Sequence, residues 1–332
     1  MADYVNIHGN NIEIRSADPS NPSDGQIWYN TTSNLLKGNI NYGTGSWSTG
    51  GTRNTNSPNG MSLGSLSAAF LVGGRVPPAP PYATSVTENY DGTTWTTGTP
   101  TGQDMDSGTG EGSQTAAIIA GTGWPGAGGK TQTTYLFTSG SWTTGPAVPG
   151  SVARYYGAAG GTAGQSAMIR FNGEAPGGSV SSASYIWNGS AWSTGNPTGT
   201  SGESAYGFGT STAAVGFTGP GGPQPTAYVV EYDGTSWAAG TAFPITGNNK
   251  STGGTLTAGI VTGGTGTPNT INALYDGTTW TVSPQSRPIG GAQPPKGEVG
   301  TQGSHLVVAV PSPTTATLEW VSGPNVVTLT SS

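Results

Sequence analysis

One pattern recurs along the whole chain: an aromatic residue, four small or polar residues, and then a tryptophan. Successive tryptophans of this pattern lie 48, 47, 50, 45 and 43 residues apart. A period of this size is typical of stacked supersecondary units and not of one continuous core. An incomplete last copy opens at Trp320, with valines where its second aromatic would stand. We expect the repeated tryptophans to be structural residues at equivalent places: Trp47, Trp95, Trp142, Trp192, Trp237 and Trp280.

Composition alone would suggest a disordered chain, because Gly 58 and Pro 25 make up a quarter of the 332 residues. The aromatic residues contradict that interpretation. Disordered chains avoid aromatic residues, since they have no core in which to bury them, whereas this chain places most of its aromatics in register. We therefore predict a folded, turn-rich protein.

The units share a plan of four strands. In residues 60–98, a Gly-rich strand is followed by the apolar run Ala68–Val72, and an alternating strand ends at Tyr90 before a last strand that carries Trp95. Continuous apolar runs suit strands that are covered on both faces. Asp-Gly and Asn-Gly pairs favour tight hairpins, so the third and fourth strands should be adjacent and antiparallel. These pairs begin at Asp91, Asn188, Asp233 and Asp276.

Repeated four-stranded units of this kind resemble the kelch repeat, in which an apolar strand ends in Gly-Gly and a Tyr-Asp pair precedes a Trp. Two copies match well: Gly73-Gly74 with Tyr90, Asp91 and Trp95, and Gly263-Gly264 with Tyr275, Asp276 and Trp280. The resemblance implies an all-β fold, a kelch-like β-propeller of four-stranded blades. It covers about 270 residues and is specific for the fold, not for a function.

Two closures of the ring fit the repeats. The first has seven blades, with residues 24–50 as a short first blade sealed by the C-terminal Val326–Thr330 and six fuller repeats in residues 51–332. The second has six blades, with residues 1–50 as a separate attachment segment. In both, residues 1–23 form an extended N-terminal arm, and residues 24–332 contain the propeller. We favour seven blades.

Strand direction alternates within a blade, so the connections sort into two faces. The first-to-second and third-to-fourth turns share one face and look short in every repeat, while the long Gly/Pro-rich connections share the other. Variable loops on a rigid scaffold are where recognition usually resides. The side chains there best suited to grip a ligand are Arg75, Tyr82, Asp104, Asp106, Trp124, Lys130 and Glu174.

Little in the sequence favours catalysis, and we expect a protein that is not an enzyme and has no cofactor and no metal. The chain has no cysteine, and its two histidines, His8 and His305, offer little to a catalytic triad or a metal site. We interpret His305 as a structural histidine at a strand end. Gly60–Gly64 fits G-x-S-x-G, but such a match arises by chance in so Gly-rich a chain. Asp104, Asp106 and Glu111 could hold calcium, although their spacing misses the EF-hand pattern.

Charge and hydropathy limit which classes of partner the chain can bind. The net charge of -6 is spread thinly and there is no basic run, so we expect no nucleic acid partner. No apolar run is long enough for membrane insertion. The first residues lack the apolar stretch of a secretion signal, so we expect a protein made in the cytoplasm and released by lysis.

The segment from Asp24 to Gly38, DGQIWYNTTSNLLKG, is similar to the opening of tail-fibre and other virion proteins of tailed phages, especially those of marine bacteria. The resemblance implies a virion structural protein, a tail fibre or surface appendage. Residues 1–50 would bind other virion proteins, and the propeller would contact a host surface glycan or protein. A homo-oligomer is possible. The alternatives are a glycan-binding lectin or polysaccharide-active propeller enzyme, and a kelch-type adaptor.

Overall fold

The computed structural model describes residues 12–19, 26–40, 45–76, 83–123, 131–150, 157–175, 178–219, 222–223, 227–247, 250–264, 268–290, 299–308, 315–322 and 325–328. Their regular structure is almost entirely β-strand, which confirms the all-β prediction. The strands form seven four-stranded sheets. The chain divides into two compact units, one of residues 47–321 and one of residues 1–46 with 322–332.

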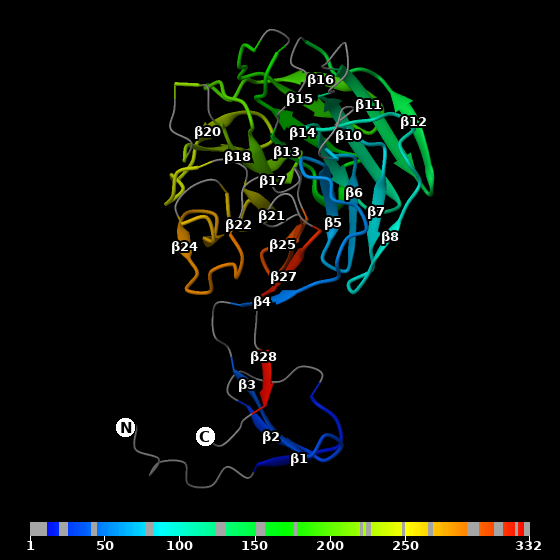
Figure 1. The fold of residues 1–332 in the computed structure, drawn as a ribbon. Coiled ribbons are helices and arrows are strands. Elements are labelled where there is room, and N and C mark those ends of the chain that lie inside the picture. Colours follow the sequence, from blue (N-terminus) through cyan, green and yellow to red (C-terminus); the bar gives the residue numbers. More distant parts are fainter. Residues whose placement is uncertain are drawn as a thin grey trace. The chain divides into compact units, whose positions relative to one another are not determined.

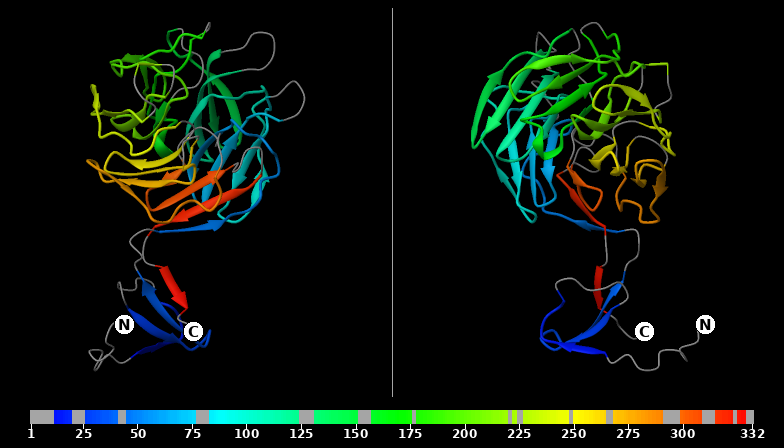
Figure 2. Two further views of the ribbon diagram at one scale, coloured as in Figure 1. Left: turned by 60° about the vertical axis from the view of Figure 1, so that its left-hand side comes forward. Right: turned by 180° about the vertical axis from the view of Figure 1, so that it is seen from behind.

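The unit of residues 47–321 contains six sheets, which we call blades one to six in chain order (Figures 1 and 2). Blade one is β5 (Met61–Ser65), β6 (Ala68–Val72), β7 (Thr87–Tyr90) and β8 (Trp95–Thr97). Blade two is β9 (Thr109–Gly112), β10 (Ala116–Thr122), β11 (Thr131–Thr138) and β12 (Ser141–Gly145). Blade three is β13 (Gly157–Ala159), β14 (Met168–Phe171), β15 (Ser184–Trp187) and β16 (Trp192–Gly195).

The remaining three blades follow the same order. Blade four is β17 (Tyr206–Thr210), β18 (Ala213–Phe217), β19 (Val229–Tyr232) and β20 (Trp237–Ala239). Blade five is β21 (Ser251–Thr255), β22 (Ala258–Thr262), β23 (Asn272–Tyr275) and β24 (Trp280–Val282). Blade six is β25 (Gly300–Thr301), β26 (Ser304–Val308), β27 (Thr317–Val321) and β4 (Ser46–Thr49).

The six blades close into a ring. The innermost strand of each blade contacts the innermost strand of the next, in the order β5, β9, β13, β17, β21 and β25, and β25 contacts β5. The seven-blade hypothesis expected seven four-stranded sheets, and the structure has seven. Six of them form the ring, as the six-blade hypothesis expected. The fold is a β-propeller.

Blade six is assembled from both ends of the propeller sequence. Its fourth strand, β4, comes from the start of the chain and lies beside β27. Trp47 on β4 and Trp320 on β27 pack with ring centroids 5.3 Å apart. Trp47 therefore supplies the second aromatic that the last copy lacks in sequence, so two incomplete copies of the repeat make one blade.

The aromatic–tryptophan pattern is an antiparallel cross-strand pair in the other blades. Tyr90 faces Trp95 across β7 and β8, and their ring centroids lie 4.9 Å apart. Asp91 accepts hydrogen bonds from the backbone N–H groups of Thr93 and Thr94 and so fixes the turn between the strands. The predicted tight hairpins are confirmed, because Asn188, Asp233 and Asp276 make the same contacts.

Side chains also join neighbouring blades. The Trp95 indole N–H donates to Thr317 Oγ1 of blade six at 3.0 Å, and the hydroxyl of Tyr90 donates to Glu319. Burial, reinforced by Glu319, raises the pKa of Tyr90 to about 12. Gln114 in the first turn of blade two donates to the carbonyls of Ala69 and Tyr90 in blade one. Equivalent glutamine contacts to the preceding blade are made by Gln165 and Gln302.

The smaller unit contains the seventh sheet: β1 (Glu13–Arg15), β2 (Ile27–Asn30), β3 (Leu35–Ile40) and β28 (Asn325–Thr328). β28 pairs with β3, as expected of the C-terminal strand. Residues 13–15 of the predicted arm belong to this sheet as β1, which is parallel to β2. Asp18 accepts hydrogen bonds from Trp28 and Asn30 and pairs with Lys37 at 2.6 Å, and Lys37 is the main cause that lowers the pKa of Asp18 to about 2.

Candidate functional site

We call the face of the propeller that carries the second-to-third and inter-blade connections the long-loop face. Arg75 follows β6 and Asp106 precedes β9, and the structure brings these two predicted residues together in an ion pair. The Asp106 side chain is buried, whereas the Arg75 side chain is 39% exposed. The pair ties the loop of blade one to the connection into blade two, and the Arg75 side chain stays partly exposed at this face. Asp104, two residues earlier, is exposed.

The other predicted residues of this face are dispersed. Glu174 follows β14 in blade three, where it is buried and its backbone bridges to Val180. Tyr82, Trp124 and Lys130 lie outside the described residues. Of the predicted residues that the structure describes on the long-loop face, Arg75 and Asp106 thus form a charged pair, Asp104 offers an exposed carboxylate and Glu174 is buried.

The opposite face, which we call the short-turn face, carries a feature that the sequence analysis missed. A glycine two residues before the first turn of a blade has a positive φ, for example +100° at Gly64 and +114° at Gly254. A Cβ on Gly254 would lie 2.1 Å from the carbonyl oxygen of Ala258, which no ordinary contact allows. The Gly-Ser or Gly-Thr pair that recurs before the second strand of five blades is the signal that could have revealed it. These pairs are Gly64-Ser65, Gly112-Ser113, Gly209-Thr210, Gly254-Thr255 and Gly300-Thr301.

Blade three departs from this plan, and here the expectation of short turns throughout was wrong. Eight residues, 160–167, join β13 to β14 and contain the 3₁₀ helix η2 (Gly161–Ala163). η2 contacts the innermost strands β5, β9 and β17 of three other blades, so it lies at the axis of the ring. The longer turn is stabilised by hydrogen bonds from Ser166 and Ala167 to the carbonyl of Ala163.

An axial cavity of about 230 Å³ adjoins η2. Its wall is formed by the ends of the innermost strands of four blades, where glycine-hydroxyl pairs converge, and by the η2 turn of blade three. Small residues line it and its surface is mainly apolar, and none of the lining residues has a charged or aromatic side chain. The lining residues are Gly64, Ser65, Gly160, Gly161, Ala163, Gly209, Thr210, Gly254, Thr255, Gly300 and Thr301.

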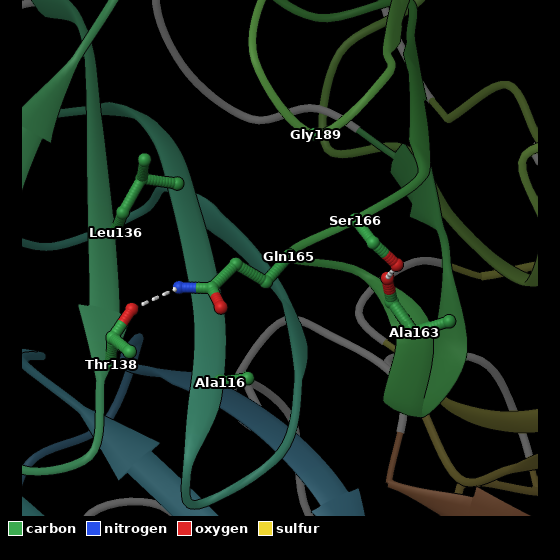
Figure 3. A pocket seen from close by; sticks show the side chains of 7 residues that line it. All are labelled: Ala116, Leu136, Thr138, Ala163, Gln165, Ser166 and Gly189. Carbon is green, nitrogen blue, oxygen red and sulfur yellow. Dashed lines mark hydrogen bonds between the residues drawn. The ribbon is translucent and has the colours of Figure 1, made fainter.

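A lateral cavity of about 410 Å³ lies on the other side of the same turn, between blades two and three (Figure 3). Gln165 crosses it and donates to Thr138 Oγ1 at 2.9 Å, while Leu136 offers an apolar wall. Ala163 lines both cavities, so the η2 turn separates them. The lining residues are Ala116, Leu136, Thr138, Ala163, Gln165, Ser166 and Gly189, all uncharged. The uncharged lining of both cavities suits a neutral ligand.

A serine and a histidine meet between blades five and six. Ser251 Oγ lies 3.0 Å from His305 Nε2, and both side chains are buried. Burial lowers the pKa of His305 to about 4, and the charge of Arg287 acts in the same direction. The imidazole is therefore neutral at pH 7, and neither group reaches solvent. This geometry agrees with the interpretation of His305 as a structural histidine.

Lys250 is a second buried polar group of the propeller. Its ammonium donates to the hydroxyl of Tyr206 at 2.9 Å and to the carbonyl of Gly247, and it lies 5.2 Å from the centre of the Phe243 ring. Burial lowers the pKa of Lys250 to about 7. The contacts join the connection between blades four and five to the innermost strand of blade four, which is a structural role.

The acidic side chains considered for calcium do not meet in the described structure. Asp106 pairs with Arg75, whereas Glu111 is buried within β9. The described residues contain no group of three or more His, Asp or Glu that could hold a metal ion. They also contain no helix of sufficient length and apolar character to cross a membrane.

Comparisons with known proteins bear on the fold of the chain and not on its function. No protein-family model matches this chain, and no curated protein does. Among solved structures, that of a protein named YjhT resembles it with a TM-score of 0.62 and 11% sequence identity, over 84% of this chain and 96% of YjhT. The likeness supports the β-propeller fold. At this identity it says nothing about what the chain binds.

Proposed function

We propose that this chain is a virion structural protein of a tailed bacteriophage, a tail fibre or surface appendage with a kelch-like propeller. The smaller unit, built from residues 1–46 and 322–332, attaches the protein to other virion proteins. The propeller provides a rigid body for contact with the host surface. The protein is made in the host cytoplasm and leaves it within the particle.

The architecture of the smaller unit is the observation that supports this proposal. The residues that carry the resemblance to virion proteins are those that hold the unit together: Trp28 is fully buried, and Trp28, Asn30 and Lys37 all bind Asp18. These contacts lie within the segment, so they stabilise the smaller unit without the propeller repeats. Modular attachment to a particle needs such a separate unit.

The direct test is mass spectrometry of purified particles. We expect the protein to remain at a fixed ratio to the major capsid protein through two successive density gradients. An abundant host protein serves as the control for contamination and should fall between the gradients. Loss of the chain in parallel with that host protein would end the proposal.

A variant of the smaller unit tests where the protein attaches. Removing a buried tryptophan costs about 3–5 kcal/mol, which a unit of this size cannot absorb, so Trp28→Ala should reduce incorporation into particles at least about tenfold. Val282→Ala, on an exposed propeller strand, is the matched control and should be incorporated normally. Thermal unfolding of the propeller should be the same in both proteins. Normal incorporation of Trp28→Ala would place the attachment site elsewhere.

A second candidate function, neutral glycan binding, is favoured by the two cavities beside η2. The lateral cavity offers Thr138, Gln165 and Ser166 to saccharide hydroxyls, and the mainly apolar lining of the axial cavity suits the C–H face of a sugar ring. None of the residues that line either cavity is charged. The binding surface would then be the short-turn face and not the long-loop face.

Titration with neutral oligosaccharides by saturation-transfer NMR tests this candidate. Ala163→Trp would place a bulky side chain on the turn that borders both cavities and should weaken binding by at least about tenfold, since the side chain takes up space that the ligand needs. Ala239→Trp, at an exposed position of β20, is the matched control and should bind like the unchanged protein. Equal binding by both variants would show that the cavities are not the site.

A further inference from the structure

The seventh sheet ends in an open edge. β1 is the outermost strand of the order β1-β2-β3-β28, and all three of its residues are exposed. It pairs with β2 on one side, and no other described strand pairs with its second edge. An open edge presents unpaired N–H and C=O groups, which are a template for a strand from another chain.

The sheet also leaves one face uncovered in the described residues. Directly paired residues in neighbouring strands point to the same face, and Ile14 pairs with Tyr29, which pairs with Leu36. Ile14 is 72% exposed and Ile27 is 46% exposed. The other face buries Trp28 under the Asp18 contacts. A unit of this size gains little stability from burying one face alone.

The charges of β1 identify the chain that fits this edge. Glu13 and Arg15 flank Ile14, and within one chain their side chains pair at 2.5 Å. In an antiparallel pairing of two β1 strands centred on Ile14, Glu13 of each copy would lie opposite Arg15 of the other. Opposite charges directly across two strands stabilise the pair, and like charges destabilise it. The strand is therefore complementary to itself.

We propose that β1 pairs with β1 of a second copy of this chain, forming a two-fold symmetric dimer through one continuous sheet. The symmetric arrangement places the two Ile14 side chains opposite each other and extends the apolar strip of Tyr29 and Leu36 into the second copy. A two-fold interface of this kind is the commonest way in which identical chains associate.

Sedimentation equilibrium of the full chain tests the proposal. We expect a monomer–dimer equilibrium for the unchanged protein. Glu13→Lys and Arg15→Glu each place like charges opposite one another twice per dimer, so each should weaken the dimer about 30-fold. The double variant with both substitutions restores the opposite charges and should return the dimer constant to within about threefold of the original.

Mixing the two single variants supplies the sharpest control. Glu13→Lys has two cations on β1 and Arg15→Glu has two anions, so the mixed dimer of the two variants should be tighter than the dimer that either variant forms with itself. Lys37 and Asp18 are left unchanged in all variants, and tryptophan fluorescence checks that the fold is kept. A chain that stays monomeric at every attainable concentration overturns the proposal, and so does an oligomer that ignores these charge changes or is not a dimer.

Discussion

Replacing Gly254 with alanine is expected to lower the free energy of unfolding of the propeller by about 4 kcal/mol. Two effects add at this position. The φ angle of +114° lies in a region that residues with a Cβ rarely adopt. The new Cβ would also lie 2.1 Å from the carbonyl oxygen of Ala258, so the turn into the second strand would have to move. Urea denaturation, monitored by tryptophan fluorescence, measures the decrease in the free energy of unfolding.

Gly102→Ala is the matched control, because it separates the two effects. Gly102 has a φ of +74°, and a Cβ there would meet nothing within 4 Å. It should therefore cost only the conformational part, about 1 kcal/mol. Equal losses for Gly102→Ala and Gly254→Ala would show that contact with the turn carbonyl does not constrain the repeat.

Replacing Lys250 with methionine is expected to stabilise the propeller at pH 7 by about 2 kcal/mol and to change how its stability depends on pH. The buried amine has its pKa lowered to about 7 by burial, against an ordinary value of 10.5. The unfolded chain therefore binds more protons between these pH values, so the stability of the unchanged protein should rise with pH. From pH 7 to pH 9.5 the rise should be about 3 kcal/mol.

The sign of this effect follows from the protonation states. Below pH 7 the folded protein holds a charged amine in a buried site, and the penalty is fully present; above that pH the amine is neutral and the penalty fades. The methionine variant lacks the group, so its stability should change much less over the same range. Tyr206 keeps a partner in the variant, since its hydroxyl also donates to the carbonyl of Gly247. A variant that is less stable at every pH, with an unchanged slope, would contradict this account.

The two cavities and the open edge of β1 separate possible roles of the two units. Ligand binding beside η2 would concern the propeller, whereas association through Glu13, Ile14 and Arg15 would concern the smaller unit. Ala163→Trp and Glu13→Lys change only one of these surfaces each. Combining them in one protein tests whether host contact and assembly are independent.

Much of the fold could be predicted from the sequence, because a blade is a local structure. The Tyr90–Trp95 pair, the Asp91 turn and the strand Ala68–Val72 lie within about 30 residues and need no information from distant segments. Their spacing therefore predicted four-stranded blades. The Gly-Ser and Gly-Thr pairs before the second strands were equally visible, but their purpose shows only in the contact with the turn carbonyl.

The candidate site was much harder to predict. Long, polar connections drew attention to Arg75, Asp104 and Glu174, but length and polarity do not say which loops leave a space between them. The cavities instead adjoin a turn of eight residues whose Gly- and Ala-rich sequence gave no sign of η2. Space is a property of several chain segments together, so a linear pattern does not reveal it.

The sequence by itself determined the repeat: its period, its aromatic pairs and its hairpins all follow from interactions between near neighbours in the chain. Only the tertiary structure decided how the copies combine. Trp47 and Trp320 are 273 residues apart in number, yet they complete one blade at 5.3 Å. Ring closure depends on the summed angles between blades and on which distant strands then meet, and no local segment contains that information.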